Sequence, residues 1–180
     1  MKRIQRLCLC LCLVVLLPTS ALAWTPNEEQ QAEINSLASV LTEANKEGQW
    51  KQVVDALPMK LYAEIAKQSG MTPEQVTQAS IGALEAAMTQ ITLKSVVMEM
   101  DRAEYLATPS GMEYVIVPTR TQMKLQDVWI EAVEPTLMFV EDGGFRAMRI
   151  ADAQQVILLR KAYPGFAGVT FDSGTKKIME

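Results

Sequence analysis

The stretch from Tyr114 to Ile150 constrains the fold most, because it combines a long alternation of apolar and polar residues with a strong turn signal. Alternation with a period of two is typical of a strand that buries one face. The residues Glu141-Asp142-Gly143-Gly144 are typical of a tight turn between antiparallel strands. The stretch therefore predicts the centre of an antiparallel sheet, against which the helices before and after it would bury their apolar faces.

Period-two patterns predict a curved sheet of four strands. Pro118 in the second strand indicates an edge position, a bulge or a bend, because proline removes a donor from the hydrogen-bond ladder. Pro135 likewise predicts a break in the third strand. The expected strands lie within Leu93–Leu106, Tyr114–Leu125, Trp129–Val140 and Phe145–Ile150.

The length of the last turn decides which side chains share a face. A three-residue loop with a glycine bulge would place Phe145 beside Leu137 and Phe139. We expect the even-length turn instead, which brings Glu141 and Arg146 together near its tip. In that register one face carries Leu137, Phe139, Met148 and Ile150.

Apolar residues spaced three and four apart predict helices before the sheet. The clearest start is Thr72-Pro73-Glu74-Gln75, with a capping threonine, a proline in the first helical position and a glutamine that can complete a capping box. The helix from Pro73 to about Ile91 carries mostly small apolar side chains, which would allow close approach to the sheet. The other expected helices are Glu28–Glu47, Trp50–Leu57 and Pro58–Ser69.

A further helix is expected after the sheet, over Ala153–Tyr163 with Asp152 as its cap. Ile157 and Leu159 are among apolar residues on most of its sides, so this helix has to dock. Docking across the mouth of the sheet would fill a pocket there, whereas packing outside would leave it open. We expect the first, because only two residues separate the helix from the last strand. Phe166–Phe171 is expected to form a short final strand.

The first 23 residues predict a secretory signal peptide. A basic start precedes the apolar run Leu7–Leu17, which is too short for a membrane span, and Ala21-Leu22-Ala23 has small residues at the cleavage positions. An uncleaved anchor is the alternative, and the short run argues against it. Cleavage after Ala23 would leave a single α+β domain at 24–172 and a disordered tail at 173–180, in a periplasmic or secreted protein without a stable membrane anchor.

The composition of the predicted mature chain excludes several chemistries. All three cysteines, Cys8, Cys10 and Cys12, lie in the leader, and the chain contains no histidine. Zinc sites built from Cys and His, catalytic triads and imidazole acid–base catalysis are therefore excluded. Without the leader's three basic residues, 14 Lys and Arg face 21 Asp and Glu, a formal charge of −7. Nucleic acid is not an expected partner, since the basic residues are scattered.

The order of elements, with short helices joined by GQWKQV, a long helix and then a sheet ending in LMFVEDGGFRAMRI, resembles secreted bacterial members of the nuclear-transport-factor-like, or cystatin-like, superfamily. The resemblance covers roughly residues 28–150. It implies an α+β cone with a pocket between sheet and helices. Proteins of this superfamily include isomerases, dehydratases and non-catalytic binding domains, whose enzymes often use Asp, Tyr or His. This chain departs from the pattern by continuing into a helix after the sheet.

Tyr114, Arg120 and Trp129 are the candidate ligand-binding residues, because aromatic faces and a guanidinium can hold an anionic or planar molecule. Six residues separate Tyr114 from Arg120 along one strand, a span of nearly 20 Å. One small ligand could hardly contact both. The competing interpretation is a half-exposed sheet face with ordinary cross-strand pairs.

Two other groups of residues have side chains that could carry chemistry. Met98 and Met100 could bind Cu(I) through their thioethers, but packing in the core explains them better. No metal site and no cofactor are predicted. A buried carboxylate could act as a general base, although no pair has a diagnostic spacing. The carboxylates expected on or near the sheet are Glu99, Asp101, Glu131 and Glu134.

The sequence therefore predicts an exported soluble binding or accessory domain of the cell envelope, with no recognisable catalytic motif. Its expected partner is an envelope protein or a small apolar or anionic ligand, and a homodimer is possible. The alternative is an enzyme of the cone-fold isomerase or dehydratase type that uses Asp or Tyr for acid–base chemistry. An open cavity lined by a buried carboxylate or tyrosine hydroxyl would favour the enzyme.

Overall fold

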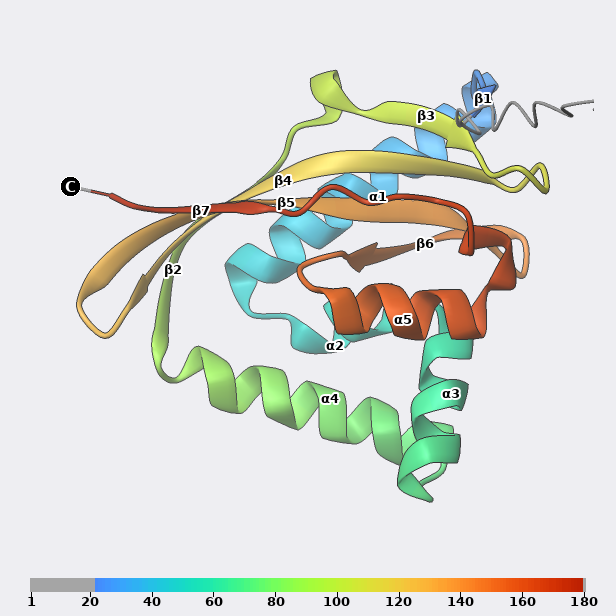
Figure 1. The fold of residues 1–180 in the computed structure, drawn as a ribbon. Coiled ribbons are helices and arrows are strands. Elements are labelled where there is room, and N and C mark those ends of the chain that lie inside the picture. The colour runs from blue at the N-terminus through green and yellow to red at the C-terminus, as the bar shows by residue number, and fades with distance from the viewer. Residues whose placement is uncertain (1–21, 180) are drawn as a thin grey trace, which may run out of the picture.

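A computed structural model describes residues 22–179 (Figure 1). The predicted α+β class is confirmed: N-terminal helices precede a curled antiparallel sheet, and a helix follows it. Within these residues no helix has the length and apolar character needed to cross a membrane. The helices are α1 (Glu28–Glu47), α2 (Trp50–Asp55), α3 (Met59–Ser69), α4 (Pro73–Met88) and α5 (Ala153–Ala162), with short 3-10 turns η1 (Met100–Arg102) and η2 (Pro164–Phe166). The strands are β1 (Leu22–Ala23), β2 (Ile91–Met98), β3 (Glu104–Ala107), β4 (Glu113–Leu125), β5 (Val128–Glu141), β6 (Gly144–Arg149) and β7 (Thr175–Ile178).

Side-chain caps set the starts of the long helices. At α4 the Thr72 hydroxyl accepts a hydrogen bond from the Gln75 backbone N–H, and the Gln75 side chain accepts one from the Thr72 N–H, so the predicted capping box is confirmed. Asn27 and Gln30 form the same arrangement at α1. Asp152 accepts from the Gln155 N–H at α5, as expected. These local contacts satisfy donors that a helix start leaves without partners.

Strands β4 and β5 form a long central hairpin whose outer neighbours change part-way along it. On one side β3 pairs with Glu113–Ile116 of β4, and β2 pairs with Thr119–Leu125. On the other side β6 pairs with Thr136–Glu141 of β5, and β7 pairs with Ile130–Val133. We call the part flanked by β3 and β6 the closed half of the sheet, and the part flanked by β2 and β7 the open half.

Two prolines, Pro118 and Pro135, lie directly opposite each other at the boundary between these halves. Directly opposed residues in an antiparallel pair either exchange two N–H···O bonds or direct both N–H groups toward the outer strands. Since proline has no N–H, the exchange is impossible and no donor is offered to either outer strand. Each proline still accepts one bond there, from the Glu99 N–H to the Pro118 carbonyl (2.9 Å) and from the Ile150 N–H to the Pro135 carbonyl (2.8 Å).

This boundary corrects two predictions about the strands. The single strand expected within Leu93–Leu106 is two strands, β2 and β3, because η1 separates them beside Pro118. The break expected near Pro135 is wrong, because β5 runs unbroken from Val128 to Glu141. In this sheet both prolines leave their own strands continuous and lie where the outer strands change.

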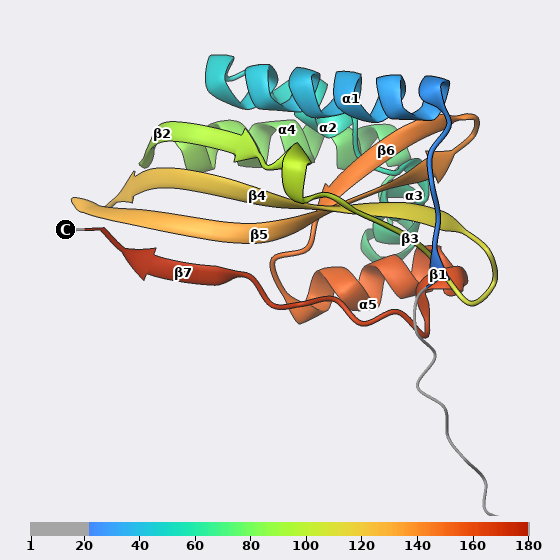
Figure 2. The same cartoon turned by 90° about the horizontal axis from the view of Figure 1, so that it is seen from above.

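The two faces of the closed half are covered by different helices (Figure 2). One face, here the α1 face, carries Val115, Val117 and Met138, which pack against Ile34 and Ala38 of α1. The other, the α5 face, carries Tyr114, Leu137 and Phe139, which pack with Leu159 of α5 and Phe166 of η2. Alternation along β4 and β5 extends both face assignments into the open half.

The even-length hairpin register is confirmed. Leu137 pairs with Met148, and the turn residues Asp142 and Gly143 have φ of 51° and 84°, as the favoured two-residue turn requires. The expected contact between Glu141 and Arg146 is wrong, because Arg146 donates to the Asp55 carbonyl at 2.9 Å.

The Glu141 carboxylate instead joins three elements. It accepts from the Met59 N–H (2.6 Å) and the Lys60 N–H (3.2 Å) at the start of α3, and from the Tyr163 hydroxyl (2.5 Å) after α5. Burial is the main cause of the raised pKa of Tyr163, and the hydrogen bond to Glu141 adds to it. A carboxylate is favoured at a helix start, where its charge meets the positive end of the helix dipole.

Helix α5 docks as expected, but it does not fill the space beneath the N-terminal helices. Leu159 is fully buried against the α5 face, which is opposite α1. Ile157, expected to be buried, is 56% exposed. The expectation that this helix plugs the pocket between the sheet and the N-terminal helices is therefore wrong.

The C-terminal segment also differs from expectation. Phe166–Phe171 forms no strand, while Thr175–Ile178, predicted to be disordered, forms β7 against β5. Gly174 makes this approach possible: a Cβ at this position would lie 2.9 Å from the Val133 carbonyl oxygen. Any other residue would push β7 away from the sheet.

Replacement of Leu159 by alanine tests how α5 contributes to stability. Leu159 has no exposed surface, so Leu159→Ala should lower the free energy of unfolding by about 2–5 kcal/mol. Ile157→Ala, at an exposed position of the same helix, is the matched control and should change it by less than about 0.5 kcal/mol. Denaturant unfolding measures both, and equal losses would show that α5 is not docked in this orientation.

Candidate functional site

The structure does not bring the three predicted ligand-binding residues together. Tyr114 is almost completely buried and packs edge-on against Phe166, with ring centroids 5.5 Å apart. Its carbonyl accepts a hydrogen bond from the Trp24 indole (3.0 Å). Desolvation is the main cause of its raised pKa, with a smaller effect of Glu104. Tyr114 is therefore a core residue beneath η2.

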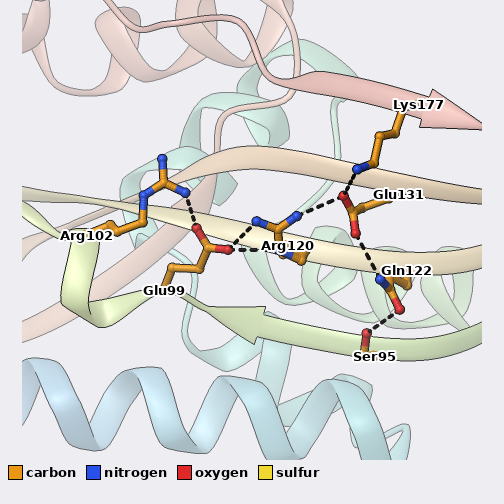
Figure 3. Close-up of polar contacts among 7 residues, drawn as sticks. All are labelled: Ser95, Glu99, Arg102, Arg120, Gln122, Glu131 and Lys177. Atoms are coloured by element: carbon orange, nitrogen blue, oxygen red, sulfur yellow. Dashed lines mark hydrogen bonds and ion pairs between the residues drawn. The ribbon is translucent and has the colours of Figure 1, made fainter.

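Arg120 lies at the centre of a polar network on the α5 face of the open half (Figure 3). Its Nε and Nη2 donate to Glu99 Oε1 at 2.9 and 2.7 Å, and its Nη1 donates to Glu131 Oε1 at 2.8 Å. Arg102 also binds Glu99. These bonds raise the pKa of Arg120, Glu99 being the largest cause. The guanidinium is thus already occupied by two carboxylates and links the end of β2 to β4 and β5.

Glu131 extends this network to the last strand. It accepts from the Gln122 amide (2.9 Å) and from Lys177 of β7 (2.8 Å), as Figure 3 shows. These two hydrogen bonds, Lys177 first, lower its pKa to about 2. The hydrogen bond from Arg120 likewise lowers the pKa of Glu99. A general base working near neutral pH needs a pKa raised toward that pH, so the network is a cross-strand clamp.

Trp129 and the remaining carboxylates lie elsewhere. Trp129 is part-buried near the far end of the open half, where Lys94 Nζ lies 5.7 Å from its ring centroid. Asp101 is exposed in η1. Glu134 is buried, with Lys176 at 3.2 Å and Arg149 at 3.7 Å. In residues 22–179 no group of three or more Asp and Glu side chains is placed to hold a metal ion.

A cleft of about 260 Å³ lies between the α1 face of the sheet and helices α1, α2 and α4. It exists because α4 does not approach the sheet as expected: its small residues Ala79, Gly82 and Ala83 are exposed, and Leu84 is its contribution to the cleft. The walls are mostly apolar. The lining residues are Leu41, Asn45, Val53, Leu57, Leu84, Val96, Met98, Thr119, Thr136, Ala147, Met148 and Arg149. Met98, weighed as a copper ligand, is thus a wall residue.

Polar groups gather where the cleft meets the middle of the sheet. The Thr119 and Thr136 hydroxyls are 2.7 Å apart and bridge β4 and β5 next to the proline pair. Arg149 ends β6 beside them, and its side chain is 35% exposed. Desolvation is the main cause of its lowered pKa, and Glu134 opposes the shift. In the described part of the chain its ion pair is with Glu134, Nη1 to Oε2, at 3.7 Å, too long for a hydrogen bond.

The sequence analysis did not identify Arg149 as a site residue. Arg149 ends the strand predicted from the turn at Gly143-Gly144, so the predicted register already indicated which face of the sheet its side chain occupies. The cleft could not be predicted in this way, because it depends on where α4 packs.

A larger recess of about 430 Å³ lies on the α5 face, beneath residues 170–175. Its floor contains Ile116, Pro118 and Pro135, and Arg102 and Glu104 contribute to its lining. Arg102 is bound to Glu99. The Arg102 side chain is more exposed than that of Arg149, 59% against 35%, but it is hydrogen-bonded to its carboxylate, whereas Arg149 lies 3.7 Å from Glu134. The cleft is therefore the stronger candidate.

No family model matches this chain, and neither a curated protein nor a solved structure is significantly similar to it.

The Glu131 carboxylate gives a testable pH dependence. Its pKa falls from 4.5 to about 2 on folding, so its stabilising effect is complete above pH 4.5 and is lost as pH falls through about 2. The free energy of unfolding should therefore decrease with falling pH across this window. Glu131→Gln should reduce the slope, measured by urea unfolding at several pH values. An unchanged slope in the variant would contradict the clamp.

Proposed function

We propose that this protein is a binding module of the cell envelope that holds a small amphipathic anion in the cleft between the sheet and helices α1, α2 and α4. The observation that carries this proposal is Arg149, a guanidinium at one end of a mainly apolar cleft, with its ion-pair carboxylate 3.7 Å away. Ligand pockets typically combine apolar walls with a few convergent polar groups that fix orientation. A guanidinium can bind a carboxylate through two parallel hydrogen bonds.

The neighbours of Arg149 allow it to exchange partners. Glu134 contacts Arg149 through Oε2 and Lys176 through Oε1, at 3.2 Å. If a ligand carboxylate replaces Glu134, the Glu134 carboxylate keeps Lys176 as a counter-ion and is not left buried without a partner. The hydroxyls of Thr119 and Thr136 lie beside the same end of the cleft. One hydrogen bond joins them, so the pair keeps one O–H that can donate to a ligand carboxylate.

The volume limits the size of the ligand. The cleft volume of about 260 Å³ is roughly nine times the volume of one water molecule in the liquid. This suits a short-chain carboxylate, with its alkyl part against Leu57, Leu84 and Val96 and its charged end on Arg149.

The isomerase or dehydratase alternative finds its best site in the recess on the α5 face, whose lining includes Tyr114 and the buried Glu134. It has less support, because Glu134 is paired with Lys176 and Arg149 and Tyr114 packs against Phe166. Such an enzyme would need an Asp or a Tyr beside its substrate, and none of the described residues that line the cleft is an Asp, Glu or Tyr. Tyr62 is buried and donates to the Val54 carbonyl at 2.8 Å, away from the cleft.

The envelope location is proposed from the leader, of which residues 1–21 lie outside the described residues. Leu22 and Ala23 pair with Leu106 and Ala107 of β3 as β1, so cleavage after Ala23 would remove this strand. Trp24 would then begin the chain, held by its indole bond to the Tyr114 carbonyl and by edge contact with Tyr105, centroids 5.9 Å apart. A first residue fixed in this way is compatible with processing at this point.

Binding of a short carboxylate by the processed protein, whose first residue should be Trp24 by N-terminal sequencing, tests the proposal. In calorimetric titrations hexanoate should bind, and hexylamine, of matched length and opposite charge, should not. Arg149→Met keeps the apolar stem and should weaken hexanoate binding at least about tenfold, because a hydrogen bond to a charged group contributes about 1.5–3 kcal/mol.

Arg146→Met is the matched control, since this arginine of the same strand donates to the Asp55 carbonyl and does not line the cleft. It should leave hexanoate binding unchanged. Equal binding of hexanoate and hexylamine, or full binding by Arg149→Met, would refute the proposal.

A further inference from the structure

The open half of the sheet ends in a surface that lies outside the cleft. We define this open end as residues 91–95, 123–131 and 176–179. It projects beyond the helices that cover the closed half (Figure 1). Three aliphatic side chains are exposed there: Leu125 by 38%, Val128 by 40% and Ile178 by 73%.

These aliphatic side chains share one face. Leu125 pairs with Val128 across the β4–β5 turn, and Ile178 pairs with Ile130. Paired residues project to the same side of a sheet, and the alternation along β4 and β5 places all of them on the α1 face. Isolated exposed aliphatics are common, whereas a group at one end of a molecule marks a contact surface.

The four lysines of the open end are divided between the two faces of the sheet. Lys94, Lys124 and Lys177 lie on the reverse face, where Lys94 stacks over Trp129 and Lys124 pairs with it across the strands. Lys176 lies on the aliphatic side and is 63% exposed.

The charge of the open end is opposite to that of the whole chain. The open end contains four lysines and two carboxylates, Asp127 and Glu131, so its formal charge is +2, whereas the formal charge of the whole chain is −4. Lys124 contacts Asp127 and Lys177 contacts Glu131, both at 2.8 Å, and Lys176 contacts Glu134, outside the open end, at 3.2 Å. The side chains of Lys176 and Lys177 nevertheless remain mostly exposed.

We propose that the open end docks on a lipid surface with anionic headgroups. Aliphatic side chains placed at the interface bury their area among the acyl chains, while lysines attract the headgroups. Lysine stems can lie along the apolar surface with their charges in the headgroup layer. Lys176 lies on the aliphatic side itself, and the reverse-face lysines add a longer-range attraction that salt screens, since the Debye length is about 8 Å at physiological salt.

A second copy of the chain fits this surface less well. A two-fold contact would place the same patch of both copies together. Two ends of charge +2 would then repel each other, whereas an anionic bilayer complements both the charge and the aliphatic side chains. This inference does not require a ligand in the cleft, although Lys176 also pairs with Glu134 beside it.

Vesicle co-sedimentation of the chain without residues 1–23 tests the inference. The protein should sediment with phosphatidylcholine vesicles that contain phosphatidylglycerol, and not with phosphatidylcholine alone, and added salt should reduce binding. The triple variant Leu125→Ser, Val128→Ser, Ile178→Ser should reduce binding at least about tenfold, because each change removes aliphatic area from the interface. Lys94→Gln, Lys176→Gln, Lys177→Gln should also weaken binding.

The control is the pair Val40→Ser, Ile157→Ser, which removes exposed aliphatics elsewhere (45% and 56%) and should bind as the unchanged protein does. Circular dichroism verifies that each variant is folded. Absence of binding to anionic vesicles, or full binding by the folded triple variant, would overturn the inference. A dimer in analytical ultracentrifugation that the triple variant dissociates, without vesicle binding, would assign the surface to a second copy and overturn it too.

Discussion

The opposed pair Pro118 and Pro135 is the constraint on which the sheet depends. Because neither residue has an N–H, no outer strand can receive a donor from either at this point. The outer neighbours therefore change on both sides, from β3 to β2 along β4 and from β6 to β7 along β5. One long hairpin thus carries two sets of outer strands end to end within one sheet.

The two halves of the sheet are stabilised in different ways. The closed half is covered on both faces, and the Glu141 carboxylate fixes the β5–β6 hairpin to the start of α3 and to Tyr163. The open half is held by side chains, with Arg120 and Glu131 joining its strands across the α5 face. The cleft that ends at Arg149 lies near the boundary, where β6 stops and α4 stands away from the sheet.

Local patterns predicted the parts of the fold that depend on neighbours in sequence. The capping box at Thr72, the cap at Asp152 and the turn at Asp142-Gly143 each satisfy backbone groups within a few residues, so their residue types reveal them. The pairing partners were not accessible in this way, because alternation shows which residues share a face and not which strand lies beside them. β7 depends on the close approach at Gly174, and all three partners of Glu141 are distant in sequence. For the site, Tyr114, Arg120 and Trp129 were placed correctly on strands, but the burial of Tyr114 and the saturation of Arg120 arise from η2 and from Glu99, which periodicity does not locate.

Amide hydrogen exchange along β4 and β5 tests the division at the proline pair most directly. Regions with separate packing open separately, with free energies that range up to that of global unfolding. The account predicts that the amides of Val115, Val117 and Met138 exchange only on global unfolding, while those of Met123 and Ile130 exchange through a smaller, local opening. A single protection level along both strands, with no step at Pro118 and Pro135, would contradict it.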